Sequence, residues 1–177
     1  TYNLNDWMVN VRKMEELGGA MGLSETLNSN LTSSSDSNNI DVHMMRTTEY
    51  GAIAILSASG YGNSKTLQNS SIKTTTGNKT GVYFKGDNWE WNAGGLQGKI
   101  FGGVNAKYYD SYTGSSSSAK VGDAFGCSEW HSAPNDSWVS SGYPYFERDS
   151  GGLFSFSSYG ANEWCAGRGV AVCGAGL

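Results

Sequence analysis

Apolar side chains recur at helical spacing in two segments of the first third of the chain. The first segment follows Asn5 and stops before the glycines at 18 and 19; its apolar residues are Trp7, Met8, Val11, Met14 and Leu17. The second begins at Thr47 or Thr48, either of which can cap a helix, and ends in SASGYG. Its expected buried stripe consists of Tyr50, Ile53, Ala54 and Leu56. We therefore expect two amphipathic helices.

Beyond residue 70 the pattern changes to short segments rich in Val, Tyr, Phe and Trp, which are separated by Gly, Asn and Ser. This pattern is typical of short strands joined by long loops. The segments are GVYF at 81–84, WEW at 89–91, KIFGGV at 99–104, YPYF at 143–146, LFSFS at 153–157 and GVAV at 169–172. Two helices followed by strands predict an α+β fold, with both helices packed on one side of an antiparallel sheet.

Two polar stretches, 28–39 and 113–118, hold too little apolar surface to pack, and we interpret them as surface loops. No internal repeat or change of composition divides the rest of the chain. A length of 177 residues suits one domain with a normal core. We therefore expect a single domain over residues 1–177.

Composition and charge narrow the range of partners. Gly contributes 25 residues and Pro only two, so much of the chain is expected to be loop, where binding residues usually sit. Twelve basic against sixteen acidic residues give a net charge of -4, so no nucleic-acid partner is expected. No apolar run approaches the roughly eighteen residues of a membrane-spanning helix, so no span is expected.

Few residues favour catalysis. The two histidines are His43 and His131, and the common hydrolase, phosphate-loop, zinc-protease and C-x-x-C motifs are absent. Cys127, Glu129 and His131 could form one corner of a zinc site, but two further ligands would be needed. A disulfide cysteine beside a surface histidine is the simpler interpretation. We expect no enzyme, no metal and no cofactor; the scattered aspartates leave a loop-bound calcium ion as an open alternative.

The three cysteines, Cys127, Cys165 and Cys173, permit one disulfide with one thiol left over. Cys165 and Cys173 would be symmetric partners across a hairpin centred near Gly169. A bridge between directly opposed strand residues is often strained, because disulfides need α-carbon separations of about 5.5 Å. The residues alone therefore leave the pairing open.

The aromatic residues give a stronger signal. Trp89 and Trp91 alternate around Glu90, so on a strand both indoles face one side and the carboxylate faces the other. We interpret both indoles as core. In the second half of the chain, Tyr and Trp lie among Ser, Gly, Asn and Asp, and those exposed together would be the rigid anchors of a binding face.

Four segments together resemble a known family. They are DVHMMRTTEYGAIAILSASGYG at 41–62, TTGNKTGVYFKGDNWEW at 75–91, YYDSYT at 108–113 and GGLFSFSSYGAN at 151–162, the last followed by GVAV. They resemble bacterial and phage surface proteins, among them variable proteins diversified by retroelements, that carry a C-type-lectin-like domain of the formylglycine-generating-enzyme (sulfatase-modifying factor) type. In that family a GLYDMSGNVWEW-like motif stands where residues 81–91 stand here. The resemblance implies a C-type-lectin-like fold, with two helices packed on a small twisted antiparallel sheet and long ligand-carrying loops.

Three departures from the family pattern bear on function. Members have an opening strand that pairs with the last strand, and nothing before Thr1 supplies it, so it would lie in removed sequence or come from another chain. The closing GFRVV motif is replaced by GRGVAV, which leaves the place of Arg168 open. The copper-binding cysteines of the enzyme branch are absent from 143–157, and the calcium motifs of sugar-binding C-type lectins are not matched. The resemblance therefore implies a non-catalytic binder.

In this family, ligands lie between the central strands and the final strand. We therefore expect an exposed recognition patch for a protein or glycan, consisting of Trp130, Asn135, Asp136, Trp138, Tyr143, Tyr145, Tyr159 and Asn162. Such an adhesive or ligand-binding domain would be extracellular, on a bacterial cell surface or on the virion of a phage or prophage. The alternative is a structural, pilin-like subunit of a filament or virion surface that self-assembles through the missing first strand.

The resemblance to C-type lectins also bears on the cysteines. Those proteins have a C-x7-C spacing near the end, matched by Cys165 and Cys173, and bond its first cysteine to one in an earlier strand or loop. The comparison implies a disulfide between Cys127 and Cys165, with Cys173 as a buried free thiol. Closing a loop of about forty residues would contribute about 3 to 4 kcal/mol and would agree with an oxidising, extracellular location.

Overall fold

The computed structural model describes residues 4–13, 40–59, 61, 89–99, 104–125, 138–148, 156–160 and 166–173. In these residues two helices, α1 (Leu4–Arg12) and α3 (Thr47–Ala58), accompany two small sheets. The strands are β1 (Ile40–Met44), β2 (Glu90–Leu96), β3 (Asp110–Tyr112), β4 (Tyr145–Arg148), β5 (Ser157–Tyr159), β6 (Ala166–Gly167) and β7 (Gly169–Cys173). Three short 3₁₀ helices are η3 (Ala106–Tyr108), η4 (Ser116–Ser118) and η5 (Val121–Asp123). This mixture confirms the predicted α+β class.

Helix α1 confirms the first predicted helix as far as the described residues reach. Its buried residues Leu4, Met8 and Val11 lie on one helical face. Leu4 and Met8 pack in a cluster with Trp91 of β2, and Val11 packs against Val42 of β1. The predicted positions after residue 13 lie outside the described residues.

Helix α3 begins at Thr47, as expected, but the predicted threonine cap is wrong. The hydroxyls of Thr47 and Thr48 each donate to Asp110 Oδ2 over 2.8 Å, and the Thr48 N–H donates to the same oxygen over 2.9 Å. The N-cap residue is Arg46, whose N–H donates to Glu49 Oε2 over 2.9 Å. A carboxylate far along the chain therefore binds the first turn, a contact that no local pattern could predict.

The apolar stripe of α3 packs mainly on η5. Tyr50 and Ala54 are buried, as predicted, whereas Leu56 is 56% exposed and was wrongly assigned to the stripe. Gly51 approaches η5 so closely that a Cβ at this position would overlap the carbonyl oxygen of Gly122. The absence of a side chain at Gly51 thus permits the close packing of α3 on η5.

The larger sheet has the strand order β3–β2–β4–β5, with β6 also paired to β2. Strand β2 runs parallel to β3 and β6 and antiparallel to β4. The prediction of an antiparallel sheet therefore holds only in part: β2–β4, β4–β5 and the separate β1–β7 pair are antiparallel, whereas β2 is parallel to β3 and β6. Strands β2, β4, β5 and β7 overlap predicted segments. The segment 81–84 and most of 99–104 lie outside the described residues.

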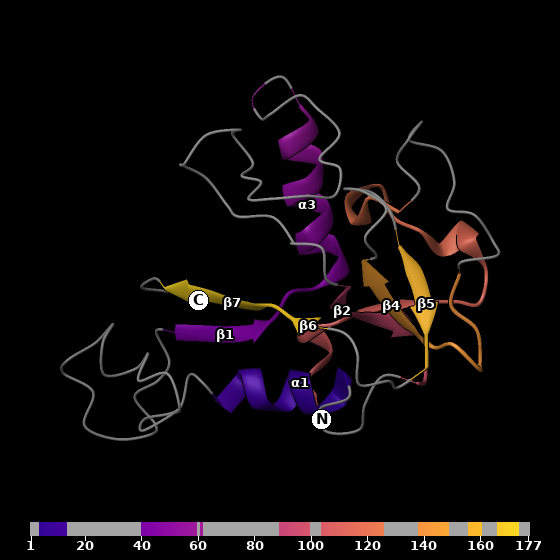
Figure 1. The fold of residues 1–177 in the computed structure, drawn as a ribbon, viewed down its shortest axis with the longest axis horizontal. Coiled ribbons are helices and arrows are strands. Elements are labelled where there is room, and N and C mark those ends of the chain that lie inside the picture. The colour runs from indigo at the N-terminus through magenta and orange to yellow at the C-terminus, as the bar shows by residue number, and fades with distance from the viewer. Residues whose placement is uncertain are drawn as a thin grey trace.

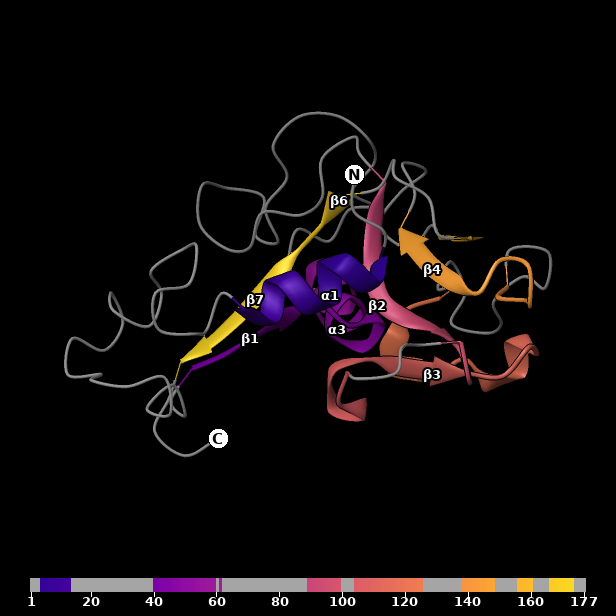
Figure 2. The same ribbon diagram turned by 90° about the horizontal axis from the view of Figure 1, so that it is seen from below.

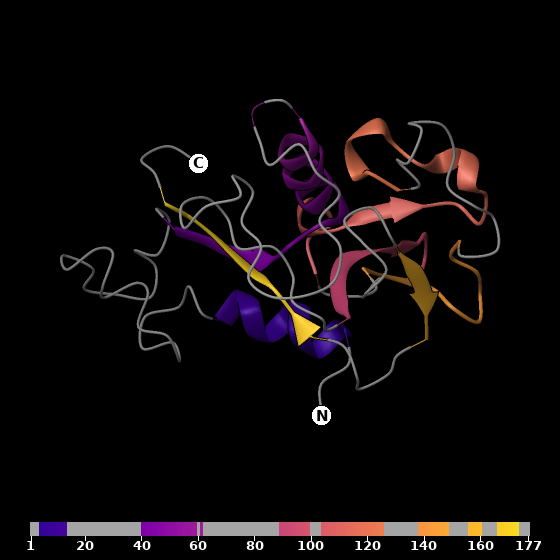
Figure 3. The same ribbon diagram turned by 45° about the horizontal axis from the view of Figure 1, so that its top comes forward.

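The last strand has its partner within the chain. Strands β1 and β7 form a separate antiparallel pair, in which Ile40 lies opposite Cys173 and Met44 opposite Gly169. Figure 3 shows this two-stranded ribbon extending away from the larger sheet. One edge of β7 is thus paired within the chain, while a further strand from before Thr1 or from another chain stays a prediction. Strand β1 was not predicted, although Ile40, Val42 and Met44 alternate with Asp41 and His43 as expected of a half-buried strand.

The two helices lie on opposite sides of the β1–β7 ribbon. Figure 1 shows α3 above the ribbon and α1 below it, and Figure 2, seen from below, has α1 in front of α3. The prediction that both helices share one side is wrong, because α1 covers β1 and Trp91 whereas α3 covers η5. None of the described helices is long and apolar enough to cross a bilayer.

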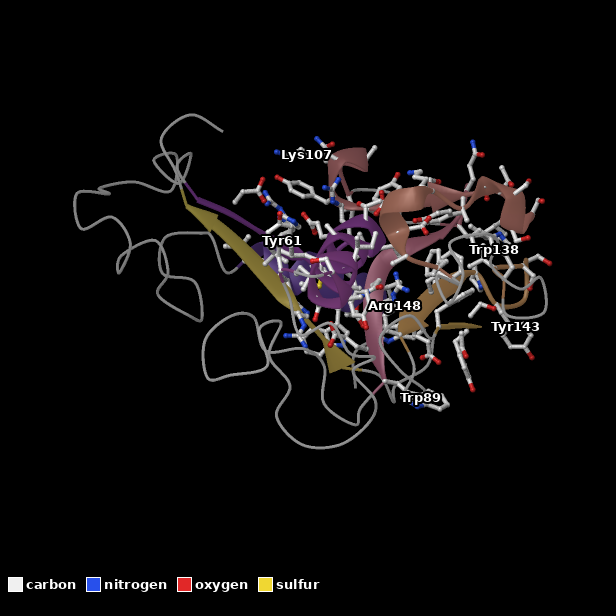
Figure 4. All side chains as sticks on the ribbon, turned by 90° about the horizontal axis from the view of Figure 1, so that it is seen from above. Tyr61, Trp89, Lys107, Trp138, Tyr143 and Arg148 are labelled. Atoms are coloured by element: carbon white, nitrogen blue, oxygen red, sulfur yellow. The ribbon has the colours of Figure 1, made fainter. Side chains whose placement is uncertain are left out.

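Arg148 is fully buried where α3, β2 and η5 meet, at the centre of the side chains drawn in Figure 4. Its guanidinium carbon lies 4.3 Å from the ring centroids of both Tyr50 and Phe125. Its Nε donates to Asn92 Oδ1 over 2.9 Å, and its Nη2 donates to the carbonyl oxygen of Asp123. Ring faces and hydrogen bonds thus replace the water that a buried cation loses.

Candidate functional site

The pairing of β4 with β5 determines which aromatic residues share a surface. Tyr145 lies opposite Tyr159, and Phe146 lies opposite Ser158. Successive strand residues point to opposite faces, so the two tyrosines share one face and Phe146 lies on the other. The face of Phe146 is the core of this half of the fold; its buried cluster also contains Tyr112, Phe125, Trp138, Val139 and Phe156.

The opposite face carries a group of partly exposed aromatic side chains, which we call the aromatic face: Trp89, Tyr143, Tyr145 and Tyr159. The ring centroid of Tyr159 lies 5.5 Å from that of Trp89 and 6.5 Å from that of Tyr143. Tyr143 is 58% exposed and Trp89 is 37% exposed, while Tyr145 and Tyr159 are half-buried. Figure 4 shows Trp89 and Tyr143 at the outer edge of the molecule, away from the central Arg148.

A buried layer supports the aromatic face. Tyr145 meets the fully buried Trp91 edge to face, with ring centroids 6.2 Å apart, and Trp91 rests on Leu4 and Met8 of α1. The Tyr145 hydroxyl donates to the carbonyl oxygen of Lys99 over 3.4 Å, and burial raises the pKa of this phenol. The ring therefore stays neutral at physiological pH. Rings held in this way offer contact area at a low cost in conformational entropy.

The structure brings together only part of the predicted recognition patch. Tyr143, Tyr145 and Tyr159 lie side by side on the aromatic face. Trp138 does not join them: its side chain is 4% exposed within the core, and its Nε1 donates to the carbonyl oxygen of Thr113 over 2.9 Å. The expectation that Trp138 is exposed is therefore wrong. The other predicted residues lie outside the described residues; they are Trp130, Asn135, Asp136 and Asn162.

Trp89 was expected to be core, but its side chain is partly exposed. Alternation around Glu90 predicted the facing correctly, because Trp89 and Trp91 contact the two cross-strand tyrosines. The Glu90 carboxylate accepts two hydrogen bonds from Arg168, from Nε to Oε1 over 2.8 Å and from Nη2 to Oε2 over 2.9 Å. Only Trp91 is core, however, because Trp89 precedes the first residue of β2 and is partly exposed.

Sequence reasoning missed a cluster of charged groups around His43. This imidazole is 7% exposed, and its Nδ1 lies 2.8 Å from Asp41 Oδ1 while its Nε2 lies 2.8 Å from Glu49 Oε1. Only the imidazolium ion can donate from both nitrogens. The hydrogen bond to Glu49, followed by that to Asp41, raises the pKa of His43 despite its burial. With both nitrogens engaged, His43 has no lone pair to offer as a general base.

The pKa values of the two carboxylates in this cluster, Asp41 and Glu49, shift downward, opposite to that of His43. Burial acts to raise the pKa values of Asp41 and Glu49, but hydrogen bonds, first among them those from His43, together with nearby positive charges hold both pKa values below their ordinary range. Asp41 Oδ2 also accepts a hydrogen bond from the Tyr108 hydroxyl over 3.1 Å. The cluster therefore ties β1 to α3 and η3 through charge-assisted hydrogen bonds.

Within the described ranges, no three His, Cys, Asp or Glu side chains are placed to hold a metal ion. The predicted disulfide partners Cys127 and Cys165, like Glu129 and His131, lie outside these ranges, and Cys173 is described only as a backbone position of β7. The disulfide between Cys127 and Cys165 stays a prediction.

A scan against protein-family models, a search of curated proteins and a search of solved structures each find no match to this chain.

Proposed function

We propose that the chain is a non-catalytic, extracellular binding domain that presents the aromatic face to a protein or glycan ligand. The observation that carries this proposal is the contact of two exposed rings, Trp89 and Tyr143, with the half-buried ring of Tyr159. Large aromatic side chains in contact with one another are enriched at interface centres, and they are costly to leave in water without a partner.

The fold proposed for the domain is C-type-lectin-like. In support, the described part of the segment 41–62 forms most of β1 and all of α3, and the tryptophan motif at 89–91 leads into the central strand of the larger sheet. The proposed ligand face lies on β4 and β5, close to the end of the chain, where members of the family carry their ligands. A location on a bacterial cell surface or a virion belongs to the same proposal.

The pilin-like alternative depended on a last strand that lacks a partner. Strand β7 pairs with β1 over five residues of each strand, so one of its two edges is occupied within the chain. We propose the binding function in preference, because the contacts among the aromatic side chains favour it.

A binding screen with point variants tests the proposal. The full chain is screened on a glycan array and against a displayed peptide library, and the best binder is titrated against Tyr143→Ala. Truncation of a central aromatic anchor costs about 2 kcal/mol of binding, which corresponds to an affinity loss of about thirtyfold.

The matched control is Tyr61→Ala, since Tyr61 is 93% exposed and is not part of the aromatic face. This variant is expected to retain wild-type affinity. Equal affinities of the Tyr143 and Tyr61 variants, or no binder in either screen, would contradict the proposal.

A further inference from the structure

A pocket of about 490 Å³ opens between the end of α1 and η3. Its lining comes from two segments far apart in the sequence and consists of Val9, Arg12, Lys13, Val104, Asn105, Lys107 and Tyr108. In Figure 4, Lys107 and Trp89 lie at opposite edges of the molecule, so this pocket is separate from the aromatic face. Its volume falls in the range of small-molecule sites, about 300 to 1,000 Å³.

The lining is strongly basic in a chain that is acidic as a whole. Arg12, Lys13 and Lys107 contribute three cations, and no lining residue is acidic, whereas the whole chain carries a net charge of -4. The Lys107 side chain is 60% exposed and Lys13 is also exposed, so both ammonium groups can reach a bound molecule. A concave site lined by one sign of charge concentrates counter-ions.

Two of these cations are held in place by the wall of the pocket. The Arg12 guanidinium lies 4.0 Å from the ring centroid of Tyr108, and its Nη1 donates to Asp41 Oδ1 over 3.2 Å. The Lys107 ammonium lies 4.6 Å from the same ring and 3.4 Å from Asp41 Oδ2. Tyr108 thus orients both cations before any ligand arrives, which lowers the entropy cost of binding.

Asp41 does not neutralise the positive charge of the pocket lining. It is not a lining residue, and it is bonded to the His43 imidazolium as well as to Arg12 and Lys107. Among the described residues of the lining and this network, the five cations Arg12, Lys13, His43, Arg46 and Lys107 accompany the two carboxylates Asp41 and Glu49, an excess of three positive charges. An anion entering the pocket would therefore meet uncompensated positive charge.

We propose that this pocket binds a small hydroxylated carboxylate, of the size and chemistry of a hexuronic acid. Lys13 and Lys107 would hold the carboxylate, the Asn105 amide would bind a hydroxyl, and Val9 and Val104 would cover the apolar face of the ring. A singly charged carboxylate suits the site better than a dianionic phosphate, because the pocket lies at the C-terminal end of α1, where the helix dipole repels further negative charge. This site goes beyond the binding proposed for the aromatic face and does not depend on it.

Titration calorimetry with the full chain and three sugar probes tests the proposal. Glucuronate is expected to bind at least about tenfold more tightly than neutral glucose, and its affinity is expected to fall as salt is raised. Glucose 6-phosphate is expected to bind no better than glucuronate. Equal affinity for glucose and glucuronate, or tighter binding of the phosphate, would overturn the assignment.

Two variants locate the site. Lys107→Gln and Lys13→Gln are each expected to weaken glucuronate binding by about tenfold. The matched control is Lys120→Gln, which removes an exposed lysine outside the pocket lining and is expected to leave the affinity unchanged. An equal loss in all three variants would reveal only nonspecific attraction to positive charge, and no loss in the first two would place the ligand elsewhere; either result contradicts the proposal.

Discussion

At the scale of single residues, His43 is the clearest case of an environment that sets a protonation state. Its two carboxylate partners at 2.8 Å favour the imidazolium, and the imidazolium in turn keeps Asp41 and Glu49 ionised. Because the folded-state pKa of His43 lies above its ordinary value of 6.5, its contribution to stability is complete below pH 6.5 and is lost as the pH rises through the raised pKa. The lowered pKa values of the carboxylates act in the other direction, so their contribution is lost as the pH falls through those values.

A His43→Gln variant tests this account. Glutamine keeps one polar contact but cannot donate to both carboxylates as a cation, so we expect it to lower the free energy of unfolding by about 2 kcal/mol at pH 5.5. The difference from wild type should be smaller at pH 9, since it shrinks as the pH rises through the raised pKa of His43. Urea unfolding at both pH values measures it; a cost that is the same at pH 5.5 and pH 9 would contradict the charged state.

The two neighbouring tryptophans give a matched pair of stability variants. Trp91 is fully buried on the face that α1 covers, so Trp91→Ala is expected to cost about 3 to 5 kcal/mol. Trp89 is 37% exposed at the end of the sheet, so Trp89→Ala should cost clearly less, about 1 kcal/mol. Thermal unfolding compares them, and equal losses would mean that the two indoles do not differ in burial.

At the scale of elements, Gly51 joins α3 to η5. Alanine favours a helix by about 1 kcal/mol over glycine, so propensity alone predicts that Gly51→Ala stabilises the protein. We expect the reverse, a loss of about 2 kcal/mol, because the added Cβ would overlap the backbone of Gly122 and Asp123. In the control, Ala52→Gly at an exposed neighbouring position, only the propensity cost of about 1 kcal/mol should appear. A more stable Gly51→Ala variant would show that α3 does not approach η5 this closely.

The helices and strands also show which elements a local sequence pattern can predict. Periodicity predicted α1 and α3, and β-rich segments predicted β2, β4 and β7, because each of these carries its own apolar pattern. Strand β5 shares only Ser157 with the predicted segment 153–157. Strand β1 was missed although Ile40, Val42 and Met44 alternate with Asp41 and His43, which is the period-two pattern of a half-buried strand. The contacts of Asp110 with the first turn of α3 could not be predicted locally, because Asp110 lies on β3.

At the scale of the whole molecule, the candidate sites were only partly predictable. Local composition identified Tyr143, Tyr145 and Tyr159, but it could not separate the buried Trp138 from the exposed Trp89. That difference depends on which rings from distant segments surround each indole. The basic pocket was not predicted at all, because neither the end of α1 nor the segment around η3 is unusual by itself.

The most direct test of the aromatic face is hydroxyl-radical footprinting of the full chain, read by mass spectrometry with and without the best binder from the screens. In the unbound protein Trp89 and Tyr143 should be oxidised readily, while Trp91 and Trp138 should resist oxidation. Binding should protect Trp89, Tyr143 and Tyr159 and leave the exposed Tyr61 reactive. Slow oxidation of Trp89 and Tyr143 in the unbound protein, or bound-state protection that spares them, would contradict the account.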